Sequence, residues 1–367
     1  MTAKAAVVAK IGTSSITDSR GVISEGAVAK LCREVAAVRG QGYPVVIVTS
    51  GAIAAGLPAL HLSDRPPTDG PTLQAISAVG QSRLMGVYDV ALGANGLVGG
   101  QVLLAPLDFV DRKQYLHARQ TLTRLLELGV VPVINENDAI ADDEVRFGDN
   151  DRLAALVAHL IGASLLVLLT DAPGLLTADP RLDTGASLID EILEVDQALE
   201  AVAGRSANPR ASGGMASKLA AAKIAAWSGV RAVIAAADRP GVLEEAVAGV
   251  AGIGTTIRPH DRRLPARKLW IAFAVGASGT VVVDDGARAA LVERATSLLP
   301  AGVVGVEGSF DADDAVEIAG LDGRVFAKGL TRHAAARIKE WAGMRTSALP
   351  PDVAHEVVHR DDLVVLP

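Results

Sequence analysis

Two of the few lysines in this sequence stand in short loops of glycine and hydroxyl residues. Lys10 precedes Gly12-Thr13-Ser14-Ser15, and Lys218 directly follows the segment Ser212-Gly213-Gly214-Met215-Ala216-Ser217. Glycines let backbone N–H groups converge on an oxyanion, and a helix N-terminus adds partial positive charge. Lysine adds a compact full charge. The combination predicts phosphate chemistry at both loops, against the alternative of two solvated surface lysines.

Further polar segments follow or precede the apolar runs of the first 240 positions. They are Thr49-Ser50-Gly51, Asn135-Glu136-Asn137-Asp138, Gly148-Asp149-Asn150-Asp151 and Thr170-Asp171. No segment fits G-x-x-x-x-G-K-[ST], which excludes a P-loop ATPase, and no G-x-G-x-x-G follows an expected strand, which disfavours a dinucleotide site. Several such loops at strand ends together indicate one binding site.

Alternating strands and helices are expected to position these loops. Continuous apolar or β-branched runs predict strands at 5–10, 45–48, 97–104, 130–134, 164–170 and 231–236. Apolar residues at helical spacing predict helices at 25–39, 114–128, 151–161 and 215–228. This order predicts an α/β fold with an open, mainly parallel sheet sandwiched by helices. Ligands bind at the carboxyl ends of strands in such a sheet, so the loops are expected to converge.

The pattern changes near the proline- and charge-rich segment 259–266, which we interpret as a linker between a domain at 1–258 and a domain at 267–367. The second domain is expected to be small and β-rich. Its predicted strands are 269–274, 280–283, 303–306, 315–318 and 325–327. Leu321-Asp322-Gly323-Arg324 between the last two is a tight hairpin signal.

Composition narrows the function classes. The 367 residues carry 35 basic and 42 acidic side chains, a net charge of −7, and only 3% are aromatic, which disfavours nucleic-acid binding. One cysteine, Cys32, fits a reducing, cytosolic compartment. The N-terminus lacks the pattern of a signal peptide. The uncharged run 153–170 has the length of a membrane span, but Gly162-Ala163-Ser164 divides it into an expected helix and strand.

A resemblance to a known family rests on motifs spread over the first domain. They are Lys10-x-Gly12-Thr13-Ser14, Val48–Gly56, Ala78–Leu84, Pro132–Asp138, Gly148–Asp151, Leu169-Thr170-Asp171, and Gly213-Gly214-Met215 with Lys218. Together they resemble the motifs of the glutamate 5-kinases, within the wider amino acid kinase family. Residues 267–367 resemble the PUA domain that many members carry. The resemblance implies ATP-dependent phosphorylation of the side-chain carboxylate of L-glutamate to L-glutamyl 5-phosphate, the first step of proline biosynthesis.

Such a reaction needs cations rather than a base. A carboxylate with a pKa of about 4 is already ionised at neutral pH. The difficulty is to bring two anions together, which calls for lysines and Mg²⁺. The resemblance implies that Lys10 contacts the phosphates, Lys218 the nucleotide and the transition state, and that Asp151 orients both lysines. Capping of a helix N-terminus is the alternative for Asp149 and Asp151.

The substrate residues follow from the same resemblance. It implies that Ser50, Asp138 and Asn150 bind glutamate, and we add Asn135 and Asp149 as candidates. Ser50 could instead be a turn hydroxyl and Asn135 a cap at a strand end. The implied ATP site comprises Lys10, Thr170, Asp171, Ser212, Gly213, Gly214, Met215, Ala216, Ser217 and Lys218. Serine replaces the family's usual threonine at 212 and 217, which keeps the hydroxyls but puts the rigidity of the loop in doubt.

Partners are also implied. The family pattern predicts a cytoplasmic homo-oligomer, a tetramer or dimer, that proline inhibits, and the lability of an acyl phosphate suggests glutamyl phosphate reductase as a partner. The tail holds 11 basic and 14 acidic residues, which disfavours RNA binding there. Two alternatives remain: another carboxylate or phosphate kinase of the same family, or a non-catalytic RNA-associated protein. Intact Lys10, Asp151 and Lys218 argue against the second.

Overall fold

The computed structural model describes residues 4–18, 20–109, 111–140, 150–178, 183, 185–196, 199–200, 203, 214–261, 263–350 and 354–366. The chain divides into two compact units, Met1–Arg263 and Leu264–Pro367. Each unit has its own sheet and its own hydrophobic core.

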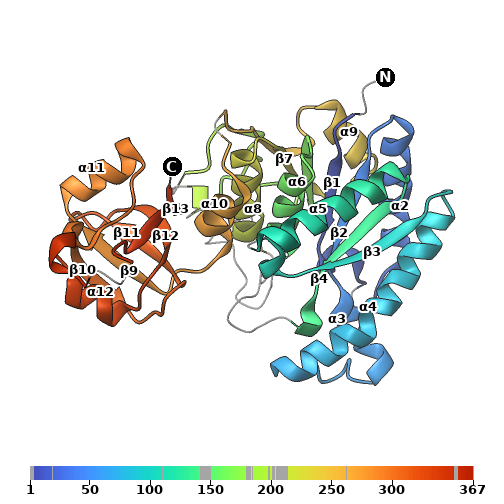
Figure 1. The fold of residues 1–367 in the computed structure, drawn as a ribbon. Helices are drawn as coiled ribbons and strands as arrows, with labels where there is room; N and C mark the ends of the chain where they lie inside the picture. The colour runs from blue at the N-terminus through green and yellow to red at the C-terminus, as the bar shows by residue number, and fades with distance from the viewer. Residues whose placement is uncertain are drawn as a thin grey trace. The chain divides into compact units, whose positions relative to one another are not determined.

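Unit 1 is built on an eight-stranded sheet with the order β3-β4-β2-β1-β5-β7-β8-β6 (Figure 1). The six strands from β3 to β7 pair in parallel, whereas β8 runs antiparallel to β7 and β6 pairs in parallel with β8. The prediction of an open, mainly parallel sheet is confirmed. The strands are β1 (Val7–Ile11), β2 (Val45–Thr49), β3 (Gly99–Leu104), β4 (Val131–Glu136), β5 (Leu165–Thr170), β6 (Glu191–Ile192), β7 (Arg231–Ala236) and β8 (Gly254–Ile257).

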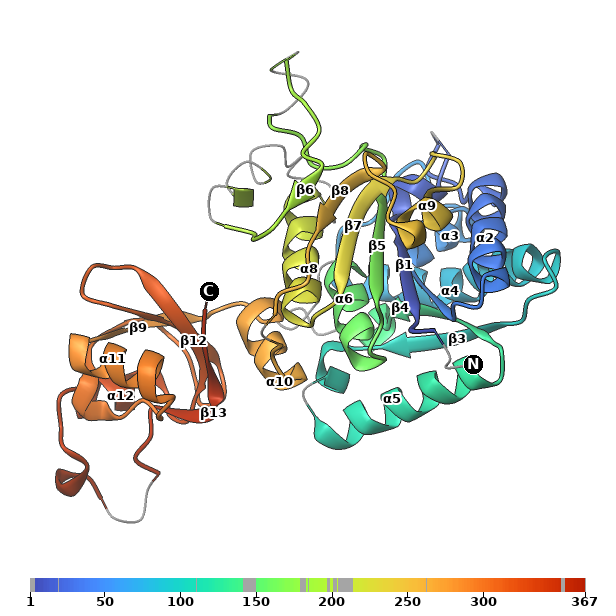
Figure 2. The same cartoon turned by 90° about the horizontal axis from the view of Figure 1, so that it is seen from above.

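Helices cover both faces of this sheet (Figure 2). One face packs against α2 (Glu25–Gly40), α4 (Gly70–Gly93) and α9 (Val242–Ala248), and the other against α5 (Arg112–Glu127), α6 (Asn150–Leu160) and α8 (Met215–Trp227). Strands β1, β2 and β5 are therefore buried along their whole length, which explains their unbroken apolar sequences. The short helices are α1 (Thr13–Ile16), α3 (Ala52–Gly56), η1 (Pro58–Leu60), η2 (Pro106–Phe109) and η3 (Asp138–Ile140).

The uncharged run 153–170 is two elements. Helix α6 ends at Leu160 and strand β5 begins at Leu165, with Gly162 in a left-handed conformation (φ 63°) between them. Across the residues described above, no helix combines the length and the apolar character that crossing a membrane requires.

Helix α4 is the main element that the sequence pattern did not predict. It crosses α3 at backbone contact: a Cβ on Gly80 would lie 1.8 Å from the Ala52 carbonyl oxygen, and one on Gly56 would lie 2.2 Å from the Ile76 carbonyl oxygen. Only glycine at both positions permits this approach. The crossing sets the position of Ser77 and Gln81, which contact Asp138 of η3 and Asn135 of β4.

Unit 2 holds a five-stranded sheet with the order β10-β9-β11-β12-β13, in which only β9 and β11 pair in parallel. The predicted hairpin at Leu321–Arg324 joins the antiparallel strands β11 and β12. The prediction of a strand at 269–274 is wrong, because Trp270–Ala274 forms one turn of π-helix (η4). A short apolar run does not by itself distinguish a buried strand from a buried helix. The other elements are β9 (Gly279–Val283), β10 (Val303–Gly308), β11 (Ala315–Ala319), β12 (Val325–Thr331), β13 (Val358–Val365), α10 (Ala266–Leu269), α11 (Asp285–Arg294), α12 (Ala335–Trp341), η5 (Pro300–Gly302) and η6 (Thr346–Ala348).

Candidate active site

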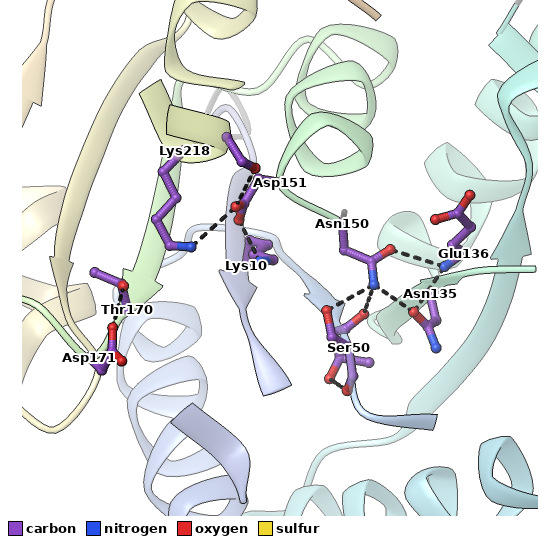
Figure 3. A network of polar contacts seen from close by, with 11 residues as sticks. Lys10, Ser50, Asn135, Glu136, Asn150, Asp151, Thr170, Asp171 and Lys218 are labelled. Atoms are coloured by element: carbon purple, nitrogen blue, oxygen red, sulfur yellow. Dashed lines mark hydrogen bonds and ion pairs between the residues drawn. The ribbon is translucent and has the colours of Figure 1, made fainter. Parts of the chain in front are cut away.

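A buried cluster of three charges lies where β1, α6 and α8 meet (Figure 3). Asp151, in the first turn of α6, places Oδ1 2.5 Å from Lys10 Nζ and Oδ2 3.2 Å from Lys218 Nζ. Lys10, Asp151 and Lys218 are 2%, 0% and 4% exposed. Ser217 Oγ donates to Asp151 Oδ2 over 2.9 Å. One carboxylate thus contacts two lysines that are far apart in the sequence, one in β1 and one in α8.

The electrostatics of the cluster keep Asp151 ionised. Burial by itself would raise the pKa of the Asp151 carboxyl. The charges of Lys10 and Lys218, with hydrogen bonds from Lys10 and Ser217, outweigh burial and hold that pKa below its usual value. Two lysine ammonium groups thus lie against one buried carboxylate. Such a pair of cations can attract an anionic ligand.

A second, uncharged network lies beside the cluster and is centred on Asn150. Its Nδ2 lies 2.9 Å from the Thr49 carbonyl oxygen, 2.9 Å from Ser50 Oγ and 2.8 Å from Asn135 Oδ1. Asn150 Oδ1 accepts from the Glu136 amide at 3.2 Å. The structure therefore brings the predicted residues Ser50, Asn135 and Asn150 together, at the ends of β2 and β4 and the start of α6.

Asp138 lies at the edge of this network. It begins η3 directly after β4, is partly exposed, and accepts a hydrogen bond from Ser77 Oγ of α4 at 3.1 Å. A carboxylate in this position can receive an ammonium group.

The nucleotide residues predicted from the sequence lie on the other side of the cluster, around the end of β5. Thr170 Oγ1 donates to Asp171 Oδ1 at 3.1 Å, and Lys218 projects between this pair and Asp151 (Figure 3). Gly214 precedes α8, and Met215, Ala216, Ser217 and Lys218 form its first turn. The first amides of a helix have no partner within the helix, so this turn suits an anionic ligand.

Three predicted site residues, Asp149, Ser212 and Gly213, lie outside the described residues. The capping alternative for Asp149 and Asp151 stays a prediction, because the residues before Asn150 lie outside the described part of the chain; the carboxylate of Asp151 contacts Lys10, Lys218 and Ser217. The alternatives for Ser50 and Asn135 stay predictions. Ser50 Oγ accepts from Asn150, and Asn135 Oδ1 accepts both from Asn150 and from the Glu136 amide next to it in the chain.

Sequence reasoning assigned no role to three residues that support this site. Gln81 Oε1 accepts from Asn135 Nδ2 at 2.9 Å, and Ser77 contacts Asp138. The Tyr88 hydroxyl donates to Thr49 Oγ1 at 2.8 Å, and burial raises the pKa of Tyr88. Ser77, Gln81 and Tyr88 all belong to α4. The motif Ala78–Leu84 marked this region only through the resemblance.

Comparison with known proteins identifies the family of this chain. Residues 5–236 match the amino acid kinase family, and residues 279–349 match the PUA domain. The chain is 42% identical to a glutamate 5-kinase of Pelobacter propionicus over 98% of this chain and 97% of that protein. It is 44% identical to glutamate 5-kinases of Geobacter sp. (strain M21) and Myxococcus xanthus, over 98% of this chain and 97% and 96% of those proteins.

Solved structures support the fold. A carbamate kinase from Giardia lamblia bound to AMP-PNP superposes with a TM-score of 0.52 at 19% identity, covering 70% of this chain and 99% of that one. A T. acidophilum isopentenyl phosphate kinase in a product complex gives a TM-score of 0.50 at 20% identity, covering 69% and 100%. At this level of identity the likeness extends to the fold alone.

Proposed function

The chain belongs to the glutamate 5-kinase branch of the amino acid kinase family, and from that premise we propose how its site works. The protein transfers the γ-phosphoryl group of ATP to the side-chain carboxylate of L-glutamate. The product is L-glutamyl 5-phosphate, and the reaction is the first step of proline biosynthesis. The observation that carries this proposal is the buried Lys10–Asp151–Lys218 cluster.

The cluster suits phosphoryl transfer to a carboxylate. The acceptor carboxylate is ionised at neutral pH, so no general base is required. What must be overcome is repulsion between two anions, and charge spreads over the transferred group in the transition state. Lys10 and Lys218 supply positive charge from two sides, and Asp151 keeps both ammonium groups in place before the substrates bind.

Glutamate would bind on the neutral side of the cluster. Asp138 would receive the α-ammonium group, and Ser50 would donate a hydrogen bond to a carboxylate oxygen. Asn150 would donate to a carboxylate oxygen by exchanging one of the three acceptors that its Nδ2 now contacts. Ser50 Oγ accepts from Asn150 Nδ2, which leaves its own proton for a substrate oxygen. Asn135 orients Asn150, and Asp149 adjoins this region in sequence. Neutral donors can hold the α-carboxylate of glutamate while the side-chain carboxylate stays free to react.

ATP would bind on the side of Thr170 and Asp171, with the segment 212–218 over its phosphates. Mg²⁺ would shield the phosphate charges and would arrive bound to ATP. Ser217 keeps the hydroxyl that the family's threonine would provide, and that hydroxyl contacts Asp151.

Further properties belong to the same proposal. Proline would compete with glutamate for the pocket around Asp138 and Asn150. The protein would act as a homo-oligomer, a dimer or tetramer, in the cytoplasm, where the buried Cys32 thiol stays reduced. Glutamyl phosphate reductase would consume the labile acyl phosphate.

One assay tests the reaction. Hydroxylamine traps an acyl phosphate as a hydroxamate, so ATP- and Mg²⁺-dependent hydroxamate should form from glutamate. Aspartate, acetylglutamate and UMP serve as comparison substrates, with ADP release as the common readout. Glutamate is expected to be the preferred substrate. Folded protein that turns over one of the others but not glutamate would overturn the assignment.

A further inference from the structure

A cavity of about 730 Å³ extends from the proposed nucleotide site toward helix α2. Its lining includes Thr170 and Asp171 at the end of β5, Asp238 after β7, and Lys30 and Glu34 of α2. The last two are charged residues that the proposed reaction does not use. Their contacts run to the loop between β7 and α9, which forms another wall of the cavity.

The Lys30 ammonium group donates hydrogen bonds to two backbone carbonyl groups of this loop. Its Nζ donates to the Ala237 carbonyl oxygen at 2.6 Å and to the Arg239 carbonyl oxygen at 2.7 Å, and it lies 2.9 Å from Glu34 Oε1. The Lys30 side chain is 23% exposed, so these charge-assisted contacts are only partly screened by water.

The Glu34 carboxylate accepts hydrogen bonds from two backbone amides at the other end of this loop, where α9 begins. Its Oε1 accepts from the Gly241 amide at 2.8 Å and its Oε2 from the Leu243 amide at 3.4 Å. Gly241 has a left-handed conformation, with φ of 71°. The two side chains, one helical turn apart on α2, therefore hold residues 237–243 by both their carbonyl and their amide groups.

The loop is joined directly to the proposed nucleotide residues. The Ala237 amide donates to the Thr170 carbonyl oxygen at 2.7 Å, and the Thr170 hydroxyl donates to Asp171. A shift of Ala237 must therefore move Thr170 or break this bond. The path from Lys30 to Thr170 passes through a single residue.

We propose that Lys30 and Glu34 are positioning residues for the nucleotide. They hold residues 237–243 against the end of β5, and so they set the affinity for ATP rather than the rate of phosphoryl transfer. The inference rests on the proposed binding of ATP at Thr170 and Asp171. Within the described part of the chain, Lys30 and Glu34 bind each other and residues 237–243, not the charged cluster of Lys10, Asp151 and Lys218.

The test measures substrate dependence in the full-length protein. Lys30→Met keeps the length of the side chain but removes its charge and its contacts with the loop. The KM for ATP should rise about tenfold, the effect of losing one charge-assisted hydrogen bond. The kcat at saturating ATP and the KM for glutamate should stay within about twofold of wild type. Titration with AMP-PNP should give the same rise in Kd without turnover.

Arg39→Met is the matched control. Arg39 lies at the other end of α2 and also binds a carbonyl oxygen, that of Gly129, at 2.7 Å. It does not line the cavity. A merely structural effect of removing a cation from α2 would appear in both variants, whereas the KM for ATP should rise only in Lys30→Met.

Several outcomes decide the matter. Unchanged AMP-PNP affinity in Lys30→Met, or an equal rise in Arg39→Met, overturns the positioning role while glutamate turnover by the wild type leaves the proposed function intact. If Lys30→Met does not fold, Glu34→Gln decides, because it keeps an acceptor for Gly241 and should raise the Kd about threefold. Wild-type protein that binds no AMP-PNP overturns both proposals.

Discussion

Asn150 and Asp151 are neighbours at the start of α6, yet they belong to two regions of the site with different electrostatics. Asp151 is surrounded by Lys10 and Lys218 in a fully buried ionic cluster. Asn150 is surrounded by the Thr49 carbonyl, Ser50 and Asn135, all without formal charge. In Figure 3, Asp151 lies between Lys10 and Lys218, whereas Asn150 lies beside Ser50 and Asn135.

The difference indicates a division of labour. Charge changes during phosphoryl transfer, so fixed cations are useful where the phosphoryl group moves. The amino acid only has to be held, and neutral hydrogen bonds can do so without repelling or trapping its carboxylate. One helix start delivers both regions because consecutive residues in the first turn project in different directions. Variants that affect one region but not the other test this division.

The largest effect is expected from Asp151→Asn. The substitution keeps the shape but removes the buried carboxylate charge that Lys10 and Lys218 share. Removal of one partner from a buried ionic cluster destabilises a protein by about 3–5 kcal/mol. Denaturant unfolding measures this loss, with Glu127→Gln as the control, because Glu127 forms an exposed pair with Arg124 that should contribute at most about 1 kcal/mol.

The pH dependence of that loss distinguishes charge from shape. Because the folded-state pKa of Asp151 lies below its usual 3.8, its contribution is present above about pH 4 and is lost as pH falls through the lower folded value. The stability gap between wild type and Asp151→Asn should therefore be constant near neutral pH and narrow in acid. A gap that persists unchanged in acid would mean that Asp151 acts through packing alone.

Lys218→Ala tests the charged region through catalysis. Loss of one cation should lower kcat by about 10²–10³, by analogy with a lost oxyanion donor. The fold should persist, because Asp151 keeps its pair with Lys10. Lys223→Ala on the same helix is the control, since Lys223 pairs with Glu200 away from the cluster. A near-normal kcat in Lys218→Ala would contradict the assignment.

Gly80→Ala tests the neutral region through the helix that supports it. The new methyl group would overlap the Ala52 carbonyl oxygen, so α3 and α4 must separate. Overpacking of this kind costs about 1–3 kcal/mol of stability, and the KM for glutamate should rise because Ser77 and Gln81 move with α4. Gly86→Ala is the control on α4, where a methyl group meets nothing within 4 Å and should stabilise by about 0.4–1 kcal/mol.

Asn150→Ala should give the smallest effect of the series. It removes the contacts to Ser50 and Asn135, and the KM for glutamate should rise about tenfold while the KM for ATP stays near wild type. Asn95→Ala, which removes an amide contact to the Ala91 carbonyl oxygen at the end of α4, is the control. An equal rise in the KM for glutamate and the KM for ATP would contradict the division of the site into a charged and a neutral region.

The sequence anticipated the elements that carry these residues where the pattern was strong. Strands β1, β2 and β5 are unbroken apolar runs because both faces of the sheet are covered. Helix α4 gave no comparable signal, because Gly80 and Gly86 weaken helix propensity in its interior and its apolar residues are not confined to one face. The support of the site by Ser77, Gln81 and Tyr88 could not be predicted without that helix.

By itself the sequence determined which residue types are available, two lysines in glycine loops and an Asn-Asp pair before a helix, and the order of strands that brings loop after loop to one edge. That Lys10 and Lys218, 208 positions apart, share the Asp151 carboxylate was expected only through the family resemblance, and the tertiary structure supplied the contacts themselves. It also decided that the neutral network rests on α4. The physical reason is that strand and helix patterns are local, whereas the pairing of buried charges and the close crossing of α3 and α4 depend on packing between segments remote in the chain.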